Sequence, residues 1–330
     1  MASERGDWMP PPATPPFDVE QTCMASACHR VGVGGSSPSR IGTALVLSGG
    51  GGRGAAQLGI LRALAERGLQ PDACVGTSVG ALNAAVVASH PLPVALDMLE
   101  RIWASPQTRA VVRSHPLRMV VNRARRQPWL RDDDAIGDLV DFSMGMAGMN
   151  TFEELPRPLQ IVVTDLLTGE PVLISQGRLR DALRASCAIP FVFRPVQLGD
   201  RSYVDGGVTD NCSISTAARM APEQIIAVDL TAEPAMPALR RLSEVFERMT
   251  SVALHSRLLA DFDSFSKRLP VTLICPRIAN PLRVADFTRV REAARTAMES
   301  LLQTVGLADG RIPPGLFYLP ISMEGSPAGG

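Results

Sequence analysis

The sequence predicts an α/β protein with three layers, in which helices cover both faces of a mainly parallel central sheet. Short apolar runs of strand length alternate along the chain with longer segments of helical periodicity, as in folds built from parallel strands. Hydrophobic residues make up 45% of the 330 residues and charged residues 20%, the composition of a globular protein. No apolar run reaches the roughly 18 to 20 residues of a membrane-spanning helix. These observations argue against a disordered, fibrous or integral membrane protein.

The expected elements follow this alternation from residue 44 onward. A buried strand at 44–48 precedes a helix with apolar spacing over 58–65, and Gly68 stands where a C-terminal cap would end that helix. A second strand at 73–76 leads into a helix at 79–88. The remaining expected strands cover 160–164, 171–174, 202–204, 225–229 and 271–275, and the remaining helices cover 178–186, 238–262 and 286–305.

The longest expected helix, 238–262, carries apolar residues near helical spacing, which predicts one buried stripe that packs against the core. A contribution of this stripe to the wall of a binding pocket stays open. The stripe consists of Leu239, Leu242, Val245, Phe246, Met249, Val252, Leu259 and Phe262.

Composition divides the chain into three parts. Residues 1–40 contain proline, serine and glycine clusters, which cannot offset the entropy of ordering and therefore predict a flexible leader. Residues 41–308 form the expected catalytic domain, because no stretch inside them resembles a linker, and 309–330 form an extension that is expected to be partly disordered. Cys23, Cys28 and His29 of the leader lack a fourth ligand at suitable spacing, so no metal site is expected there.

Charge and cysteine content narrow the function further. The 33 basic and 33 acidic side chains cancel, which removes the positive field that nucleic-acid binding usually requires. The 6 cysteines show no paired CxxC spacing, so they suit reduced thiols in a cytoplasmic protein better than a disulfide scaffold or a zinc ribbon. Residues 1–40 have no central apolar stretch and do not resemble a signal peptide.

A candidate nucleophile lies at Ser78. Residues 76–80 read Gly-Thr-Ser-Val-Gly, the GxSxG pattern of a nucleophile elbow, and they lie between an expected strand and an expected helix, as that motif requires. Gly76 and Gly80 flank the serine because the turn leaves no room for neighbouring side chains. The positive end of the following helix favours negative charge that develops beside Ser78. A strand-to-helix turn without chemistry is the alternative interpretation.

A glycine-rich loop precedes the elbow in the chain. Gly49, Gly50, Gly51, Gly52, Arg53 and Gly54 lie between the first strand and the first helix, where backbone amides can surround an anion. The anion is either a dinucleotide pyrophosphate or the oxyanion of an acyl-transfer intermediate. A dinucleotide fold needs an acidic residue at the end of the second strand, but Asp72 precedes that strand, so the oxyanion is favoured.

A serine hydroxyl needs a base to take its proton, and two candidates remain open. His255 follows Ser78 and Asp205 in the order of an α/β-hydrolase triad, but it falls inside the long expected helix and is more typical of a packing residue. Asp205 follows the short strand 202–204 and precedes Gly206 and Gly207, a turn that lets the backbone approach closely.

Taken in order, these residues resemble the patatin-like phospholipase family. Its pattern joins a GGGx(R/K)G loop, a GxSxG elbow and a DGG/A turn, and residues 185–195 are similar to its ASxAxPxxFxP stretch. The resemblance covers about residues 42–305 and implies the three-layer α/β/α fold, a Ser78–Asp205 dyad without histidine, and an oxyanion hole formed by 49–54. It also implies that Arg53 supports the glycine loop.

The chain departs from the family pattern at two points, which bear on local geometry and substrate preference. Gly52 occupies a variable position of the glycine loop. Asn211-Cys212-Ser213 replaces the Asn-x-Pro that often follows the DGG turn, and Ser213 is expected to cap the next helix.

The resulting hypothesis is a serine lipid acyl hydrolase that cleaves phospholipid or lysophospholipid esters through an acyl-enzyme, with no metal or organic cofactor. The lipid class comes from the resemblance. The segment 109–131 contains seven arginines, several apolar residues and no acidic residue, so it suits peripheral contact with an anionic membrane or a cover over the pocket. A pI near 6.9 permits self-association. A regulatory protein with conditional activity, or acyl transfer to another alcohol, stays open.

Overall fold

The computed structural model describes residues 41–112, 134–232, 242–278, 287–306 and 312–321, and these residues belong to one unit, Arg40–Gly330. Their centre is a nine-stranded sheet in the order β5-β6-β3-β2-β1-β7-β8-β9, and β4 pairs with β3 outside this path. The strands are β1 Thr43–Leu47, β2 Ala73–Thr77, β3 Leu159–Asp165, β4 Pro171–Ile174, β5 Val196–Leu198, β6 Arg201–Asp205, β7 Gln224–Val228, β8 Val271–Ile278 and β9 Gly315–Ile321.

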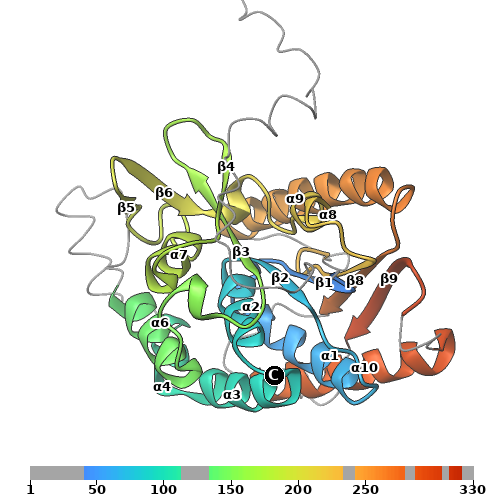
Figure 1. Ribbon diagram of the computed structural model, residues 1–330. Coiled ribbons are helices and arrows are strands. Elements are labelled where there is room, and N and C mark those ends of the chain that lie inside the picture. Colours follow the sequence, from blue (N-terminus) through green and yellow to red (C-terminus); the bar gives the residue numbers. More distant parts are fainter. Residues whose placement is uncertain (1–40, 113–133, 233–241, 279–286, 307–311, 322–330) are drawn as a thin grey trace, which may run out of the picture. The chain divides into compact units, whose positions relative to one another are not determined.

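The sheet is mixed and mostly parallel, as the sequence predicts. β1, β2, β3, β7, β8 and β9 form parallel pairs, whereas β4, β5 and β6 add antiparallel pairs beside β3. Helices cover both faces (Figure 1). They are α1 Ala55–Ala65, α2 Val79–Ser89, α3 Leu92–Ala104, α4 Pro106–Val112, α6 Asp134–Ala147, α7 Leu179–Ser186, α8 Ile214–Arg219, α9 Leu242–Ser266 and α10 Phe287–Val305.

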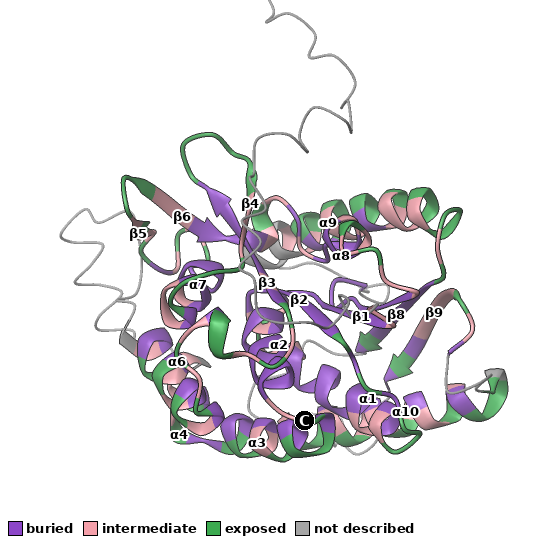
Figure 2. Cartoon of the chain, viewed as in Figure 1, coloured by how far each residue is buried: buried purple, intermediate pink, exposed green. Residues whose placement is uncertain are grey.

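The two faces of the sheet carry separate hydrophobic cores because side chains alternate along each strand. In β1, Leu45 and Leu47 belong to the core beneath α1, α2, α3 and α10, whereas Ala44 and Val46 belong to the core beneath α8 and α9. All five residues of β1 are buried, which is typical of a parallel strand covered on both sides (Figure 2). The three-layer α/β/α arrangement is therefore confirmed.

Helix α1 shows how the sequence sets local structure. It ends before Gly68, which has φ of +80° and allows the Leu69 N–H to donate to the Leu64 carbonyl at 3.1 Å. Its Gly59 faces α10, where an added Cβ would lie 2.1 Å from the Arg291 carbonyl oxygen. The absence of a side chain at Gly59 therefore lets the two helices pack at backbone contact.

The structure corrects several sequence-based boundaries. The helix expected at 238–262 is α9, Leu242–Ser266, and residues 233–241 lie outside the described residues. Within its expected buried stripe, Met249 and Val252 are exposed, because α9 packs on only one side. β5, α3, α4 and α6 were not expected, and β9 extends the sheet beyond the boundary placed at residue 308.

The sequence-based hypotheses for the leader, 1–40, and for residues 322–330 fall outside the described residues. None of the helices in the described ranges is long and apolar enough to span a membrane.

Candidate active site

Ser78 occupies a sharp turn between β2 and α2. It has φ of 54° and ψ of −127°, a conformation that L residues with a side chain rarely adopt and that structures retain only when the surroundings enforce it. The surroundings here are the glycines expected from the sequence. A Cβ at Gly80 would lie 2.2 Å from the Leu47 carbonyl oxygen, and one at Gly76 would lie 2.5 Å from the Cα of Ala81. Only glycines fit this elbow.

A second serine holds the elbow in place. Ser186, at the end of α7, accepts a hydrogen bond from the Ser78 N–H at 2.8 Å and donates one to the Val162 carbonyl at 2.7 Å. Ser186 is fully buried. Its hydroxyl therefore ties the strained residue to the centre of β3. The sequence placed Ser186 inside the ASxAxPxxFxP stretch but gave it no role.

Strand β3 brings Asp205 to Ser78. Thr77 of β2 pairs with Val162, and Asp205 of β6 pairs with the next residue, Val163. The approach is close because a Cβ at Gly206 would lie 2.3 Å from the Val162 carbonyl oxygen and 3.1 Å from the Thr77 methyl group. The structure thus unites two candidates that are far apart in the sequence.

The Ser78 hydroxyl lies close enough to the Asp205 carboxylate to favour its ionised form. The Gly207 N–H donates to the same carboxylate, to Oδ1, at 2.8 Å. Ser78 is 7% exposed and Asp205 is 6% exposed, so little solvent reaches the pair. Burial raises the pKa of Asp205 to about 6, and the nearby Ser78 hydroxyl and the Gly207 N–H oppose the rise. A carboxylate with this pKa is ionised at neutral pH and is more basic than an ordinary aspartate.

The glycine loop lies beside Ser78. A Cβ at Gly49 would lie 3.1 Å from the Cβ of Ser78. The Gly49 N–H donates to the Asn211 carbonyl at 3.3 Å, and the Arg53 N–H donates to the Gly50 carbonyl at 3.2 Å. Of the six loop residues proposed from sequence, Gly49 and Arg53 therefore use their amides within the fold.

The free amides of this loop are those at its centre. Among the described residues, the N–H groups of Gly50, Gly51 and Gly52 have no hydrogen-bond acceptor, as expected for the first turn of a helix, here the 3₁₀ helix Gly51–Gly54. The Arg53 side chain donates from Nε to the Gly50 carbonyl at 3.4 Å. Arg53 therefore contacts the loop, and its supporting role stays a prediction.

A buried polar network holds both ends of the glycine loop. Trp103 Nε1 donates to Asn83 Oδ1 at 3.1 Å, and Asn83 Nδ2 donates to Gln57 Oε1 at 2.8 Å and to the Gly54 carbonyl at 3.4 Å. Gln57 Nε2 then donates to the Ser48 carbonyl at 2.9 Å. Gln57 and Asn83 are fully buried. Sequence reasoning missed this network, although a lone amide inside each of two apolar helices was the available signal.

The opposite side of the loop rests on the segment that follows β7. The Leu230 N–H donates to Ser48 Oγ at 2.9 Å, and Ser48 Oγ donates to the Gly49 carbonyl at 3.0 Å. A Cβ at Gly50 would lie 2.6 Å from the Cβ of Leu230. Asn211 adds a hydrogen bond from Nδ2 to the Gly49 carbonyl at 3.3 Å. The loop is therefore fixed by contacts on two sides.

His255 is placed away from a triad. Its Nδ1 lies 2.9 Å from Asp229 Oδ2 and its Nε2 lies 3.2 Å from the Tyr318 hydroxyl. Both ring nitrogens therefore have partners other than Ser78 and Asp205. The structure does not bring together the Ser-Asp-His arrangement that was kept as the alternative.

Ser213 corrects a smaller expectation. It stands at the N-cap position of α8, but its side chain makes no cap hydrogen bond to the helix backbone. Its hydroxyl contacts Asp210 Oδ2 at 2.5 Å and Thr216 Oγ1 at 2.6 Å instead. Asp210 is buried, and a buried carboxylate without hydrogen-bond partners is costly. The Ser213 hydroxyl therefore donates to Asp210 and leaves the helix backbone uncapped.

Two further hypotheses fall outside the described residues. Of the segment 109–131, only 109–112 is described, as the end of α4, so the membrane-contact hypothesis stays a prediction. Cys23, Cys28 and His29 are likewise outside the described ranges.

Comparison with known proteins agrees with the motifs. The sequence profile described as "Patatin-like phospholipase" matches residues 45–218, more than half of the chain. The chain belongs to the patatin-like phospholipase family. An uncharacterised NTE family protein of Mycobacterium tuberculosis is 35% identical over 209 residues, which cover 62% of this chain and 53% of the relative. This patatin-like chain thus matches about half the length of that relative.

Relatives with lower sequence identity also match only part of their own length. Patatin-like phospholipase domain-containing protein 7 of Rattus norvegicus is 28% identical over 192 residues, which cover 57% of this chain and 13% of the rat protein. Among solved structures, VipD from Legionella pneumophila matches with a TM-score of 0.42 and 16% identity, over 82% of this chain and 68% of VipD.

Proposed function

We propose that the protein is a serine lipid acyl hydrolase of the phospholipase A or lysophospholipase type, with Ser78 as the nucleophile and Asp205 as the base. The observation that carries the proposal is the position of the Ser78 hydroxyl beside a buried carboxylate whose pKa is about 6. A serine is a weak nucleophile until such a group takes its proton. Membership of the patatin-like phospholipase family supports the lipid class.

In this proposal Ser78 Oγ attacks the ester carbonyl carbon while its proton passes to Asp205. The carbonyl oxygen becomes an oxyanion, and the N–H groups of Gly50, Gly51 and Gly52 stabilise it; one well-placed donor contributes about 3 kcal/mol in comparable sites. Asp205 then protonates the departing alcohol, which leaves an acyl ester on Ser78. Water attacks that ester and gives its proton to Asp205, which returns the proton to Ser78 Oγ as the acyl–oxygen bond breaks and the fatty acid leaves.

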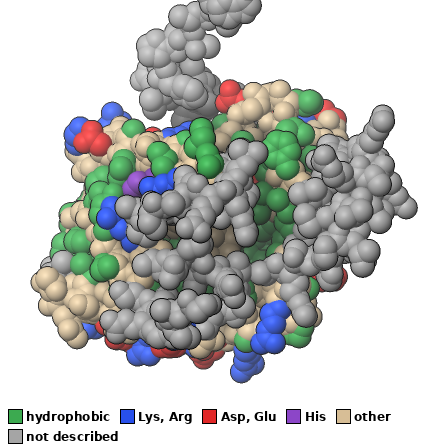
Figure 3. All heavy atoms as spheres, turned by 180° about the vertical axis from the view of Figure 1, so that it is seen from behind, with side chains coloured by type: hydrophobic (Ala, Val, Ile, Leu, Met, Phe, Trp, Pro, Cys, Tyr) green, Lys and Arg blue, Asp and Glu red, His purple; other side chains and the backbone are tan. Residues whose placement is uncertain are grey.

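Apolar side chains around the site support a lipid substrate. Val208 follows the DGG turn and is 53% exposed, and Phe191, beyond α7, is 70% exposed. Hydrophobic side chains also reach the surface on the face in Figure 3, beside arginine and lysine side chains. Val208 is three residues from Asp205, and Phe191 is three residues from Ala188, whose carbonyl accepts the Asp205 N–H at 3.0 Å. Exposed apolar side chains at these positions suit a substrate that is itself apolar.

The decisive experiment compares wild-type protein with Ser78→Ala and Ser143→Ala. Ser143 is a matched control, because its buried hydroxyl donates to the Leu139 carbonyl at 2.7 Å within α6 and lies in no proposed catalytic contact. Each protein is incubated with mixed membrane lipids, and the extracted lipids are analysed by mass spectrometry. We expect free fatty acid and a matching lysolipid or deacylated product from wild type and Ser143→Ala, and none from Ser78→Ala.

Two outcomes would oppose the proposal. Equal fatty acid release by Ser78→Ala would remove Ser78 as nucleophile. New acyl esters without free fatty acid would indicate transfer to an alcohol other than water, with the same residues in use.

A further inference from the structure

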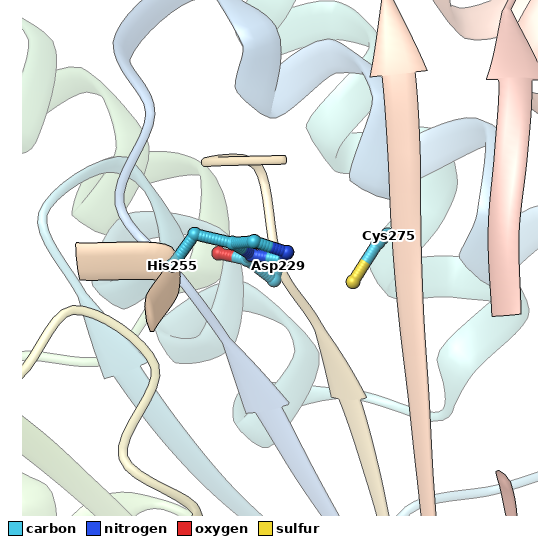
Figure 4. A group of neighbouring side chains, drawn as sticks. All are labelled: Asp229, His255 and Cys275. Atoms are coloured by element: carbon cyan, nitrogen blue, oxygen red, sulfur yellow. The ribbon is translucent and has the colours of Figure 1, made fainter. Parts of the chain in front are cut away.

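Three side chains with metal-binding atoms meet on the α9 side of the sheet, outside the Ser78–Asp205 pair (Figure 4). Asp229 follows β7, Cys275 belongs to the neighbouring strand β8, and His255 extends from α9. One ligand atom from each residue lies within 4.8 Å of the other two. Neither the family motifs nor the proposed reaction uses these three residues.

The group is buried and its orientation is fixed. Asp229 and Cys275 have no exposed surface, and the His255 side chain is 17% exposed. The Thr231 hydroxyl lies 2.7 Å from Asp229 Oδ1 and 2.8 Å from Oδ2, and the Thr231 N–H donates to Oδ1 at 3.1 Å. Tyr318 contacts the second nitrogen of His255. Partners of this kind orient metal ligands in proteins and tune their affinity.

The donor set selects the ion. A thiolate, an imidazole and a carboxylate together suit Zn²⁺, whereas Mg²⁺ and Ca²⁺ prefer oxygen ligands alone. Zinc distances of about 2.0 to 2.3 Å place neighbouring ligand atoms of a tetrahedral site roughly 3.3 to 3.6 Å apart. His255 Nδ1 and Asp229 Oδ2 lie 2.9 Å apart and share a hydrogen bond, so an ion between them would replace that bond and separate the two atoms by about 0.5 Å. A movement of about 1 Å would bring Cys275 Sγ into range.

We propose that Asp229, His255 and Cys275 bind a Zn²⁺ ion, with water on the partly exposed side of His255 as the fourth ligand. On binding, the Cys275 thiol releases its proton to solvent and its sulfur bonds to the metal, and His255 keeps its proton on Nε2, beside the Tyr318 hydroxyl, so that Nδ1 can bind the ion. The ion would adjoin Leu230, whose N–H holds Ser48 at the start of the glycine loop. The site requires no catalysis at Ser78, so it stands apart from the proposed reaction.

The test uses the full chain, stripped of metal, with Cys23→Ser and Cys28→Ser to remove two leader cysteines that could also bind metal. Zn²⁺ binding is measured by elemental analysis after gel filtration, and Co²⁺ binding by absorption, because a thiolate-to-cobalt band reports a bound cysteine. We expect one ion per chain and a thiolate band. Cys275→Ser should remove the band and weaken Zn²⁺ binding at least tenfold.

Matched variants separate a metal site from simple packing. Cys74→Ser changes an equally buried thiol in β2 and should keep both the band and the affinity. Tyr318→Phe should weaken Zn²⁺ binding about tenfold, since it removes a hydrogen bond to a ligand but leaves all three ligands. His255→Gln provides a second ligand variant on the partly exposed helix α9. Ser78→Ala should bind Zn²⁺ as wild type does, whatever the outcome for hydrolysis.

The proposal is overturned if the parent chain binds no more Zn²⁺ or Co²⁺ than Cys275→Ser. It is also overturned if Cys74→Ser loses as much binding as Cys275→Ser.

Discussion

Replacing Asp205 by asparagine should stabilise the fold at neutral pH while it removes activity. The carboxylate is 6% exposed, and burial raises its pKa from 3.8 to about 6. A group whose pKa is higher in the folded state than in the unfolded state favours folding when it is protonated. This contribution is complete below pH 3.8 and is lost as the pH rises through about 6. At pH 7 the ionised, buried Asp205 therefore destabilises the protein.

The expected magnitude follows from the shift of about two pKa units. Relative to low pH, the ionised carboxylate destabilises the fold by about 0.6 kcal/mol at pH 4, about 1.6 kcal/mol at pH 5 and roughly 3 kcal/mol at pH 7. Asparagine has a similar shape, and its Oδ1 can accept the hydrogen bond that the Gly207 N–H donates to Asp205. The free energy of unfolding of Asp205→Asn should thus exceed that of wild type by an amount that grows over this pH range.

Both proteins are unfolded in urea at several pH values between 4 and 8. The difference between their free energies of unfolding is then compared across these pH values. Asp141→Asn is a control of opposite sign, because the Arg180 guanidinium lowers the pKa of Asp141 and this exposed ion pair favours folding only above the unfolded pKa. Its variant should be slightly less stable at pH 7. A difference for Asp205→Asn that does not change with pH, or that is largest at pH 4, would refute the assignment of a buried, raised pKa.

Three further predictions concern rate and packing. Turnover of a short-chain ester should fall about tenfold per pH unit below the pKa of about 6, as protonation of Asp205 removes the base, and a pH–rate profile measures this. Asn83→Ala should lower the free energy of unfolding by about 2 to 4 kcal/mol, because buried donors and acceptors lose their partners, and should slow turnover; an unchanged urea midpoint would contradict the network. Gly80→Ala should prevent folding or abolish turnover, since its Cβ would meet the Leu47 carbonyl at 2.2 Å. Gly145→Ala, with no atom within 4 Å of the added Cβ, should instead raise thermal stability slightly.

The central part of the fold was predictable because its signals are local. Parallel strands covered on both faces give short apolar runs, and Gly68 marked the end of α1. The edges of the sheet were harder to predict. β5 has only three residues, which is too short a pattern to predict a strand. β9 contains Pro320, a residue that is unfavourable inside a sheet, so its sequence alone does not predict a strand either. In β9 the register with β8, and not the local sequence, decides the structure.

Some residues of the candidate site were predictable from local motifs, and others were not. Motifs located Ser78, the glycine loop and Asp205, because tight turns restrict the residue types that fit. The supporting contacts span long distances in the sequence: the Ser78 N–H bonds to Ser186, 108 residues away, and the Leu230 N–H bonds to Ser48, 182 residues away. Periodicity carries no information about such pairs. They emerge only once the sheet order is known.

Backbone strain at Ser78 and buried charge at Asp205 explain why so many polar contacts surround these two residues. A non-glycine residue at φ of 54° costs about 1 to 3 kcal/mol, and the ionised Asp205 costs a similar amount. Both groups would relax if their neighbours were free to move. Ser186 fixes the elbow from β3, and the hydrogen-bond chain through Asn83 fixes the glycine loop from α2. The chain can therefore keep a strained serine beside a basic carboxylate, because the contacts of Ser186 and Asn83 hold the elbow and the glycine loop in place.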